Sequence, residues 1–249
     1  MIRTVVVFLF LALAVFLGLP WLILWSLAAG NPDLMYSSAI KVARVANRLA
    51  GMRVRVHGVE NIPARACIFA ANHTSNLDPL ALLPAIPRRV SFLAKREVFR
   101  VPVLGTGMRL AQFVLVDRAN REAATASVDA AARSLKEGLS FMVFPEGTRS
   151  PDGRMRSFKK GTFVMAIEAG VPIVPVSIAG TQNLMQKGTW AIHPGEVAIR
   201  FGQPVDASQY SADRRGELLA QVEALVAAGL PAEQQPAGAS PASNSDAAE

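Results

Sequence analysis

The sequence predicts an α/β protein, with a mostly parallel central sheet covered by helices and an N-terminal membrane-anchoring helical segment. Three observations support this prediction. Short β-branched or aromatic runs alternate with longer amphipathic ones along most of the chain. Several of the short runs, such as residues 66–71 and 141–144, are continuously apolar, as is typical of parallel strands that are buried on both faces. The chain also begins with an apolar stretch that is long enough to cross a lipid bilayer.

This apolar stretch, residues 5–29, carries no charged side chain over 25 positions. As one helix it would be about 37 Å long, against a hydrocarbon core of roughly 30 Å. Gly18 and Pro20 interrupt it, so the stretch predicts either a kinked single span or a hairpin of two short pieces that enters one leaflet. A cleaved signal peptide is the alternative, since Arg3 precedes the stretch and small residues end it. The length of the apolar run favours a retained anchor.

Residues 33–49 predict a second helix, with apolar and basic side chains on adjacent stripes. The basic stripe carries Lys41, Arg44 and Arg48. Such a helix can lie in the membrane interface, or it can be an ordinary surface helix that has one solvated face and one packed face. Basic residues flank the apolar stretch on both sides, so the positive-inside rule gives no orientation. Together the two helices define an N-terminal membrane-anchoring region, residues 1–51.

Residues 52–230 contain the other expected elements and should form one domain. The expected strands are 53–57, 66–71, 90–94, 113–116, 141–144, 173–178 and 197–201. The expected helices are 79–83, 101–111, 122–137, 160–169 and 213–227, with Gly170 as the C-cap of the fourth. Ligands of such sheets bind outside the carboxyl ends of the strands. Polar residues that directly follow a strand are therefore the candidates for a functional site.

Residues 231–249 are rich in Ala, Pro, Ser, Gln and Asn, contain no Lys or Arg, and predict a disordered tail. Without the three acidic residues of this tail, the net charge of the chain rises from +7 to +10. Such a charge favours anionic headgroups and phosphorylated substrates as partners. Nucleic acid would also suit a basic chain, but only two Tyr and three Trp are present, two of the Trp lie in the N-terminal stretch, and no nucleic-acid-binding motif occurs, so no nucleic-acid partner is expected.

Cys67 is the only cysteine, which excludes an intrachain disulfide. It lies in an apolar run, with Arg65 as the only nearby cation. A lowered thiol pKa is therefore not indicated, and we expect a buried strand cysteine rather than a nucleophile.

The first candidate site is residues 72–78, of sequence NHTSNLD, directly after an expected strand. Asp78 precedes Pro79 at the start of an expected helix, so it could simply be an N-cap. Alternatively, the five-residue separation folds back as a turn, and the Asp78 carboxylate holds the His73 imidazole in the tautomer whose free nitrogen faces the substrate. His73 could then remove an alcohol proton.

The second candidate site is residues 144–150, of sequence FPEGTRS, which also follows an expected strand. Arg149 offers a planar fork that suits phosphate oxygens. Lys159 and Lys160 could add positive charge, although solvated lysines are common at helix ends. Glu146 could be no more than the ion-pair partner of Arg149.

With two further segments, these motifs resemble the glycerolipid acyltransferases, specifically the 1-acyl-sn-glycerol-3-phosphate acyltransferases with the His-x4-Asp motif. The four blocks of that family correspond in order to residues 72–78, 112–118, 144–150 and 171–178. The similarity covers about residues 54–205. Four blocks in the same order make an accidental likeness improbable.

The resemblance implies acyl transfer from acyl-CoA or acyl carrier protein to the 2-hydroxyl of lysophosphatidic acid, which gives phosphatidic acid for phospholipid biosynthesis. It implies no metal and no cofactor beyond this acyl co-substrate. It also implies a location at the cell inner membrane, with the active site facing the cytoplasm and the lipid bilayer as a partner. His73 would be the general base and Asp78 its orienting group. The residues that it assigns to substrate binding are Arg118, Glu146, Gly147, Thr148 and Arg149.

Other functions have weaker support. A serine hydrolase would need a Gly-x-Ser-x-Gly elbow, which is absent from the sequence. The three histidines have no metal-ligand spacing. The Gly-Thr-Gly segment at 105–107 lacks the third glycine of a dinucleotide site. A non-enzymatic membrane adaptor would explain the anchor and the charge but not the paired motifs. Among acyltransferases, another acceptor such as a lyso-ornithine lipid stays open.

Overall fold

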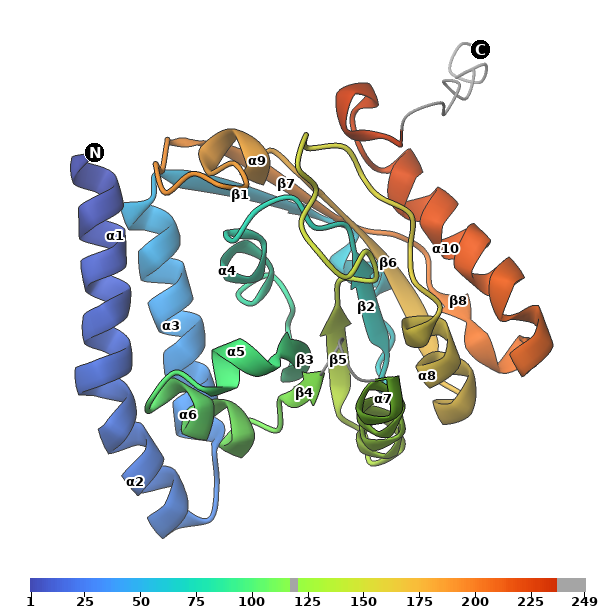
Figure 1. The fold of residues 1–249 in the computed structure, drawn as a ribbon, viewed down its shortest axis with the longest axis horizontal. Coiled ribbons are helices and arrows are strands. Elements are labelled where there is room, and N and C mark those ends of the chain that lie inside the picture. Colours follow the sequence, from blue (N-terminus) through green and yellow to red (C-terminus); the bar gives the residue numbers. More distant parts are fainter. Residues whose placement is uncertain (117–120, 237–249) are drawn as a thin grey trace.

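The computed structural model describes residues 1–116 and 121–236, which form a sheet with helices on both faces (Figure 1). Within this part of the chain the sheet has eight strands, in the order β1-β7-β6-β2-β5-β3-β4, with β8 paired to β6. The strands are β1 (Met52–His57), β2 (Ile68–Ala71), β3 (Val90–Lys95), β4 (Val114–Val116), β5 (Ser140–Val143), β6 (Pro172–Ala179), β7 (Gly195–Phe201) and β8 (Val205–Asp206).

The predicted fold class is confirmed: β2 to β6 run parallel, and β1 is parallel to β7. The pair β6–β7 is antiparallel, as is β6–β8. All seven expected strands are present, each within two residues of its expected ends. The two-residue β8 was not predicted, because it is too short to carry a sequence period.

The helices are α1 (Ile2–Leu13), α2 (Leu19–Ala29), α3 (Asp33–Leu49), α4 (Asp78–Leu82), α5 (Arg96–Phe99), α6 (Leu104–Leu110), α7 (Arg121–Lys136), α8 (Gly161–Ala169), α9 (Thr181–Leu184) and α10 (Arg215–Ala228). Gly170 ends α8 in the left-handed conformation, as predicted. The single-turn helices α5 and α9 were not predicted, since four residues show no helical periodicity.

Two hydrophobic clusters bury the two faces of the sheet. Side chains of β2 alternate between them: Phe69 and Ala71 belong to the cluster under α1 and α4, whereas Ile68 and Ala70 belong to the cluster under α7, α8 and α10. Figure 1 shows α7, α8 and α10 gathered on one side and α1 to α6 on the other. The carboxyl ends of β2 and β5 emerge between these layers.

The N-terminal apolar stretch is one continuous helix, Ile2–Ala29, which is long and apolar enough to cross a membrane by length and composition. A π-helical turn at Ala14–Gly18 joins α1 to α2. This turn precedes Pro20, which lacks the N–H that a regular helix would use. The alternative of a hairpin of two short pieces within residues 5–29 is therefore wrong, and α3 instead packs back beside α1 and α2 (Figure 1). The interruption therefore distorts the helix without reversing the chain.

The N-terminal helices share a core with the domain that follows them. Val7 of α1 is buried in the same cluster as Met52 of β1, and the side chain of Leu19 contacts Gly107 of α6. The side chains that face away from the domain are apolar and exposed, among them Val5, Leu9, Leu13, Phe16, Leu17, Trp21, Leu24 and Trp25. An apolar helix face of this size is suited to lipid.

The start of the predicted tail is ordered, which corrects the expected boundary at residue 231. Residues Ala232–Gln234 form a 3-10 turn, and Gln234 is buried. The Met155 N–H donates to the Gln234 carbonyl oxygen at 2.7 Å, which fixes this segment to the domain. Residues 237–249 lie outside the described residues.

Cys67 is fully buried, as predicted. Burial raises the pKa of its thiol to about 11, so the protein keeps it as a neutral packing group.

Candidate active site

The sheet brings the two predicted motifs together. β2 and β5 are neighbouring parallel strands, with Ala70 opposite Val143. Residues 72–78 and 144–150 therefore leave the same edge of the sheet on adjacent strands. This is the place where ligands bind in sheets of this type.

His73 and Asp78 form a direct pair, with 2.8 Å between His73 Nδ1 and Asp78 Oδ2. The same carboxylate oxygen accepts the backbone N–H groups of Thr74 and Ser75, at 2.8 and 2.9 Å. Asp78 is therefore not an N-cap, because its partners precede the helix rather than follow it. Its side chain is fully buried, whereas 18% of the His73 side chain is exposed. A carboxylate at Nδ1 keeps the proton there and leaves Nε2 free to accept one.

Phe144 fixes the plane of the imidazole. Its ring stacks on that of His73, with centroids 4.1 Å apart and planes inclined by 20°. The histidine ring is thus held at its edge by a carboxylate and on one face by an aromatic ring. This geometry is suited to a general base with a single orientation.

The second motif also holds the backbone of His73. Glu146 Oε1 accepts the His73 N–H at 2.8 Å, and the Ser150 N–H donates to the His73 carbonyl oxygen at 2.8 Å. Residues 72–78 and 144–150 are consequently one hydrogen-bonded unit. The expected ion pair between Glu146 and Arg149 does not occur among the described residues, since Glu146 turns inward to the first motif.

Glu146 is a buried carboxyl group, only 2% exposed. Burial raises its pKa from 4.5 to about 8, and the nearby Asp78 carboxylate adds to the rise, whereas the hydrogen bond from the His73 N–H opposes it. Within the described chain its Oε2 atom has no hydrogen-bond partner. At neutral pH this group is therefore largely protonated.

Gly147, Thr148 and Arg149 continue from Glu146 towards the surface, and all three are half-buried. Gly147 has a φ of +77°, and the Lys159 side chain packs where its Cβ would be. Lys187 Nζ donates to the Arg149 carbonyl oxygen at 2.8 Å. In the described part of the chain no hydrogen bond or ion pair engages the Arg149 guanidinium, so its donors are available to a ligand.

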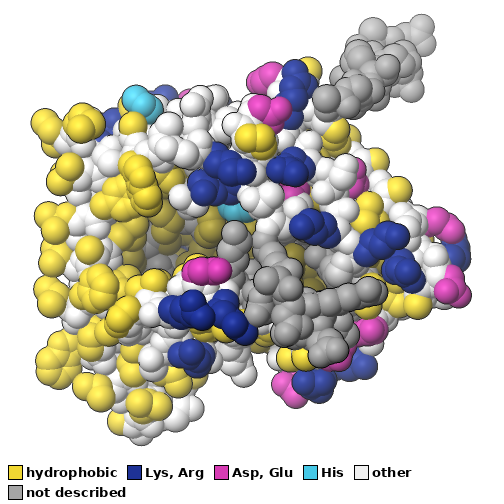
Figure 2. Space-filling model, viewed as in Figure 1, with side chains coloured by type: hydrophobic (Ala, Val, Ile, Leu, Met, Phe, Trp, Pro, Cys, Tyr) yellow, Lys and Arg dark blue, Asp and Glu magenta, His cyan; other side chains and the backbone are white. Residues whose placement is uncertain are grey.

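Figure 2 shows Lys and Arg side chains gathered over the middle of this face, beside a hollow with a hydrophobic floor. The hydrophobic surface of the N-terminal helices lies on the other side of the hollow (Figures 1 and 2). Arg118, the remaining predicted binding residue, lies outside the described residues. A basic rim beside an apolar hollow matches a ligand with a charged head and an apolar tail.

Two supporting contacts were missed by sequence reasoning. Thr181 Oγ1 lies 3.0 Å from Thr74 Oγ1, and Ser75 Oγ donates to the Met185 carbonyl oxygen at 2.7 Å. Both partners follow β6, more than 100 residues along the chain. No local pattern indicates such contacts, because each depends on how β6 returns beside β2.

Asn72 also makes a contact that sequence reasoning missed. Its replacement by alanine should destabilise the fold. Its fully buried amide donates to the Ile178 carbonyl oxygen at 2.9 Å and accepts the Ile178 N–H at 2.7 Å. Loss of both bonds leaves two buried polar groups unpaired, so we expect the free energy of unfolding to fall by about 2–4 kcal/mol. Urea unfolding in detergent measures this. Asn76→Ala, at an exposed position of the same motif, should change it little.

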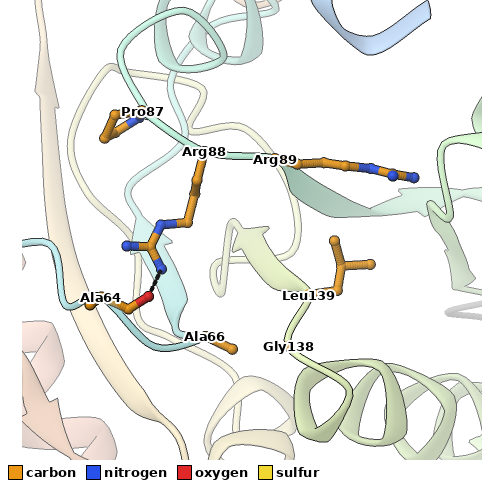
Figure 3. A pocket seen from close by; sticks show the side chains of 7 residues that line it. All are labelled: Ala64, Ala66, Pro87, Arg88, Arg89, Gly138 and Leu139. Atoms are coloured by element: carbon orange, nitrogen blue, oxygen red, sulfur yellow. Dashed lines mark hydrogen bonds between the residues drawn. The ribbon is translucent and has the colours of Figure 1, made fainter. Parts of the chain in front are cut away.

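A separate recess lies at the opposite edge of the sheet, before β2, β3 and β5, and is lined by Ala64, Ala66, Pro87, Arg88, Arg89, Gly138 and Leu139 (Figure 3). The Arg88 guanidinium donates to the carbonyl oxygens of Ala64 and Arg65 at 3.2 and 2.7 Å. It also bonds the carbonyl oxygen of Pro63. This arginine serves the backbone of the loop before β2, and the recess is remote from His73.

Comparison with known proteins decides the family. A profile of the Acyltransferase family matches residues 53–179, which include both motifs. The 1-acyl-sn-glycerol-3-phosphate acyltransferase of Limnanthes douglasii is 34% identical over 195 residues, covering 78% of this chain and 69% of the relative. The chain belongs to the acyltransferase family.

Two further relatives agree. The 1-acyl-sn-glycerol-3-phosphate acyltransferase of Pseudomonas aeruginosa is 32% identical over 189 residues, 76% of this chain and 72% of that protein. The crystal structure of the 1-acyl-sn-glycerophosphate (LPA) acyltransferase PlsC from Thermotoga maritima superposes with a TM-score of 0.80 at 33% identity, covering 90% of this chain and 92% of that one. The family resemblance and the enzyme class predicted from the motifs are confirmed. The roles of single residues stay predictions.

Proposed function

We propose that this acyltransferase moves an acyl chain from acyl-CoA or acyl carrier protein to the 2-hydroxyl of 1-acylglycerol-3-phosphate and forms phosphatidic acid. The observation that carries the proposal is the His73–Asp78 pair, which is hydrogen-bonded to the motif of Arg149, whose guanidinium has no partner among the described residues. The names of the relatives support the same acceptor. The His73–Asp78 pair suits a hydroxyl group, and the Arg149 guanidinium suits a phosphate group.

In the proposed reaction His73 Nε2 takes the proton of the acceptor hydroxyl as its oxygen attacks the thioester carbonyl carbon. The Asp78 carboxylate stabilises the imidazolium that forms. Collapse of the tetrahedral intermediate breaks the carbon–sulfur bond, and the proton passes from His73 to the leaving thiolate. An ester and a free thiol result, and no acyl-enzyme is required.

The phosphate of the acceptor would lie against Arg149, with Gly147, Thr148 and Arg118 as further binding residues. The bidentate fork of an arginine suits a phosphate monoester. Glu146 would contribute indirectly, by holding the His73 backbone. The acyl chains would occupy the apolar hollow between this rim and the N-terminal helices (Figure 2).

The N-terminal apolar helix is compatible with membrane association. Its exposed face supports the bilayer as partner, and its packing against the domain favours a helix pair that lies in one leaflet. A location at the cell inner membrane, with the site facing the cytoplasm, fits a reaction that uses an intracellular thioester.

Replacing Arg149 by alanine should raise the KM for lysophosphatidic acid about 10- to 100-fold, because one charge-assisted interaction with the phosphate is lost. The kcat should change less, since the base is untouched. Steady-state kinetics in detergent measure both constants. Arg133→Ala, at an exposed position of α7 on the other face of the sheet, is the matched control. An unchanged KM in the Arg149 variant would remove this residue from phosphate binding.

The acceptor itself is tested by comparing lysophosphatidic acid with lysophosphatidylcholine and a lyso-ornithine lipid, each with acyl-CoA and with acyl carrier protein. Preference for lysophosphatidic acid is expected. Activity on another acceptor alone would keep the mechanism and overturn the substrate.

A further inference from the structure

All three tryptophans of the chain are exposed, although tryptophan is usually a well-buried side chain. Trp21 and Trp25 lie on α2 and are 74% and 58% exposed. Trp190 is 69% exposed and lies in the segment between α9 and β7. It belongs to none of the four family blocks. We call residues 186–192 the tryptophan loop.

The tryptophan loop lies against α1. The Trp190 ring meets the ring of Phe8 edge to face, with centroids 5.5 Å apart and planes inclined by 64°. Val5 and Leu9, on either side of Phe8, are 62% and 57% exposed. The indole therefore extends the exposed apolar face of α1 instead of forming an isolated patch.

The loop has a defined shape. Ile192 is buried, and its N–H donates to Thr4 Oγ1 at 2.9 Å, which pins one end of the loop to α1. The Thr189 N–H donates to the Gln186 carbonyl oxygen at 3.2 Å and closes a turn with Gly188 at a φ of +90°. The tryptophan is thus held outward by an ordered backbone.

The tryptophan loop and the residue directly before it are bonded to the two motifs of the candidate active site. Lys187 Nζ donates to the Arg149 carbonyl oxygen at 2.8 Å. Just before the loop, the Met185 carbonyl oxygen accepts the Ser75 hydroxyl at 2.7 Å. The loop therefore connects α1 with the backbone of the phosphate-binding residue.

We propose that the tryptophan loop is a second bilayer contact, in which Trp190 inserts at the level of the lipid headgroups beside α1 and holds Arg149 at the membrane surface. The role given to Arg149 rests on the proposed function. A lipid bilayer is the partner because the indole is continuous with the apolar face of α1 and α2. Indole rings are favoured at the boundary of headgroups and acyl chains. The neighbouring Lys187 suits anionic headgroups.

Fluorescence tests the insertion without any assay of activity. The full chain with Trp21→Phe and Trp25→Phe keeps Trp190 as its sole tryptophan. It is reconstituted in vesicles of phosphatidylcholine and phosphatidylglycerol, with bromine atoms near the headgroup, at mid-chain or at the chain end. We expect strongest quenching by the bromine nearest the headgroup, and protection from aqueous acrylamide. An indole that is not quenched by any brominated lipid overturns the proposal.

Activity tests the link to the site. For lysophosphatidic acid presented in vesicles, Trp190→Ser should lower kcat/KM about 10-fold and Trp190→Phe much less. Both variants should match the wild type in detergent micelles and unfold at the wild-type temperature. Equal losses in vesicles and micelles would overturn the proposal in favour of a structural role. A higher KM for acyl carrier protein alone would overturn it in favour of protein docking. If no protein is active on any acceptor, the proposed function fails, whereas the quenching result still decides the insertion.

Discussion

The His73→Ala protein is expected to lose about 10³-fold in kcat for acyl transfer to lysophosphatidic acid. The substitution removes the group that takes the hydroxyl proton, while the phosphate-binding side of the site is unchanged. The KM should therefore stay close to that of the wild type. The surrounding turn should persist, because the Asp78 carboxylate still accepts the N–H groups of Thr74 and Ser75. Steady-state kinetics in detergent give both constants.

His193→Ala is the matched control, since His193 is an exposed histidine between α9 and β7. It should retain wild-type activity. A His73→Ala protein with full activity would eliminate His73 as the base. A parallel fall in melting temperature would show instead that the ring is needed for folding, and the temperature scan separates these results.

Replacement of Glu146 by glutamine should change how stability depends on pH. The folded-state pKa of Glu146 is about 8, above its ordinary 4.5, so between these values the unfolded chain releases a proton that the folded chain keeps. The free energy of unfolding of the wild type consequently falls as pH rises from about 4.5 to 8, by at most about 5 kcal/mol from this group. Glutamine is neutral throughout and should remove that fall.

The two proteins should be equally stable near pH 5, and the variant should be more stable at pH 8 by about 1–3 kcal/mol. The glutamine carbonyl can still accept the His73 N–H, so the hydrogen bond between the motifs is kept. Urea unfolding at several pH values measures the difference. Glu168→Gln, at an exposed position of α8, should leave the pH dependence as it is. A Glu146→Gln protein that followed the wild-type curve would mean that Glu146 ionises freely in the folded state.

The sheet and the main pair of the site were predictable because each has a local signature. Buried parallel strands are continuously apolar, and His73 and Asp78 lie five residues apart on one turn. The antiparallel direction of β7 was not predictable, since a strand's composition does not give its direction.

The role of Glu146, which accepts the His73 N–H, was also not predictable from the sequence. Its partner is the backbone of a residue 73 positions earlier, and every residue type except proline carries the same N–H there. Asn72 is similar, because its amide bonds the backbone of Ile178 rather than a side chain. Contacts between a side chain and a distant backbone group leave no pattern in the sequence. The ordered start of the tail at Ala232–Gln234 depends likewise on one backbone bond from Met155.

The pairing of β1 with β7 sets an order of events during synthesis. Arg55 and Glu196, which join these strands, are 141 residues apart, and among the described strands β1 lies at the edge of the sheet with β7 as its only neighbour. At about 5–20 residues per second, the ribosome needs roughly 7–28 s to make the intervening chain. During that interval α1, α2 and α3 have already been synthesised, but the cluster that buries Val7 and Met52 is incomplete, because it includes Val197 and Ile199 of β7. The sheet is therefore completed only after the apolar N-terminal helices have been made, so these helices fold before the strand that closes their side of the sheet is available.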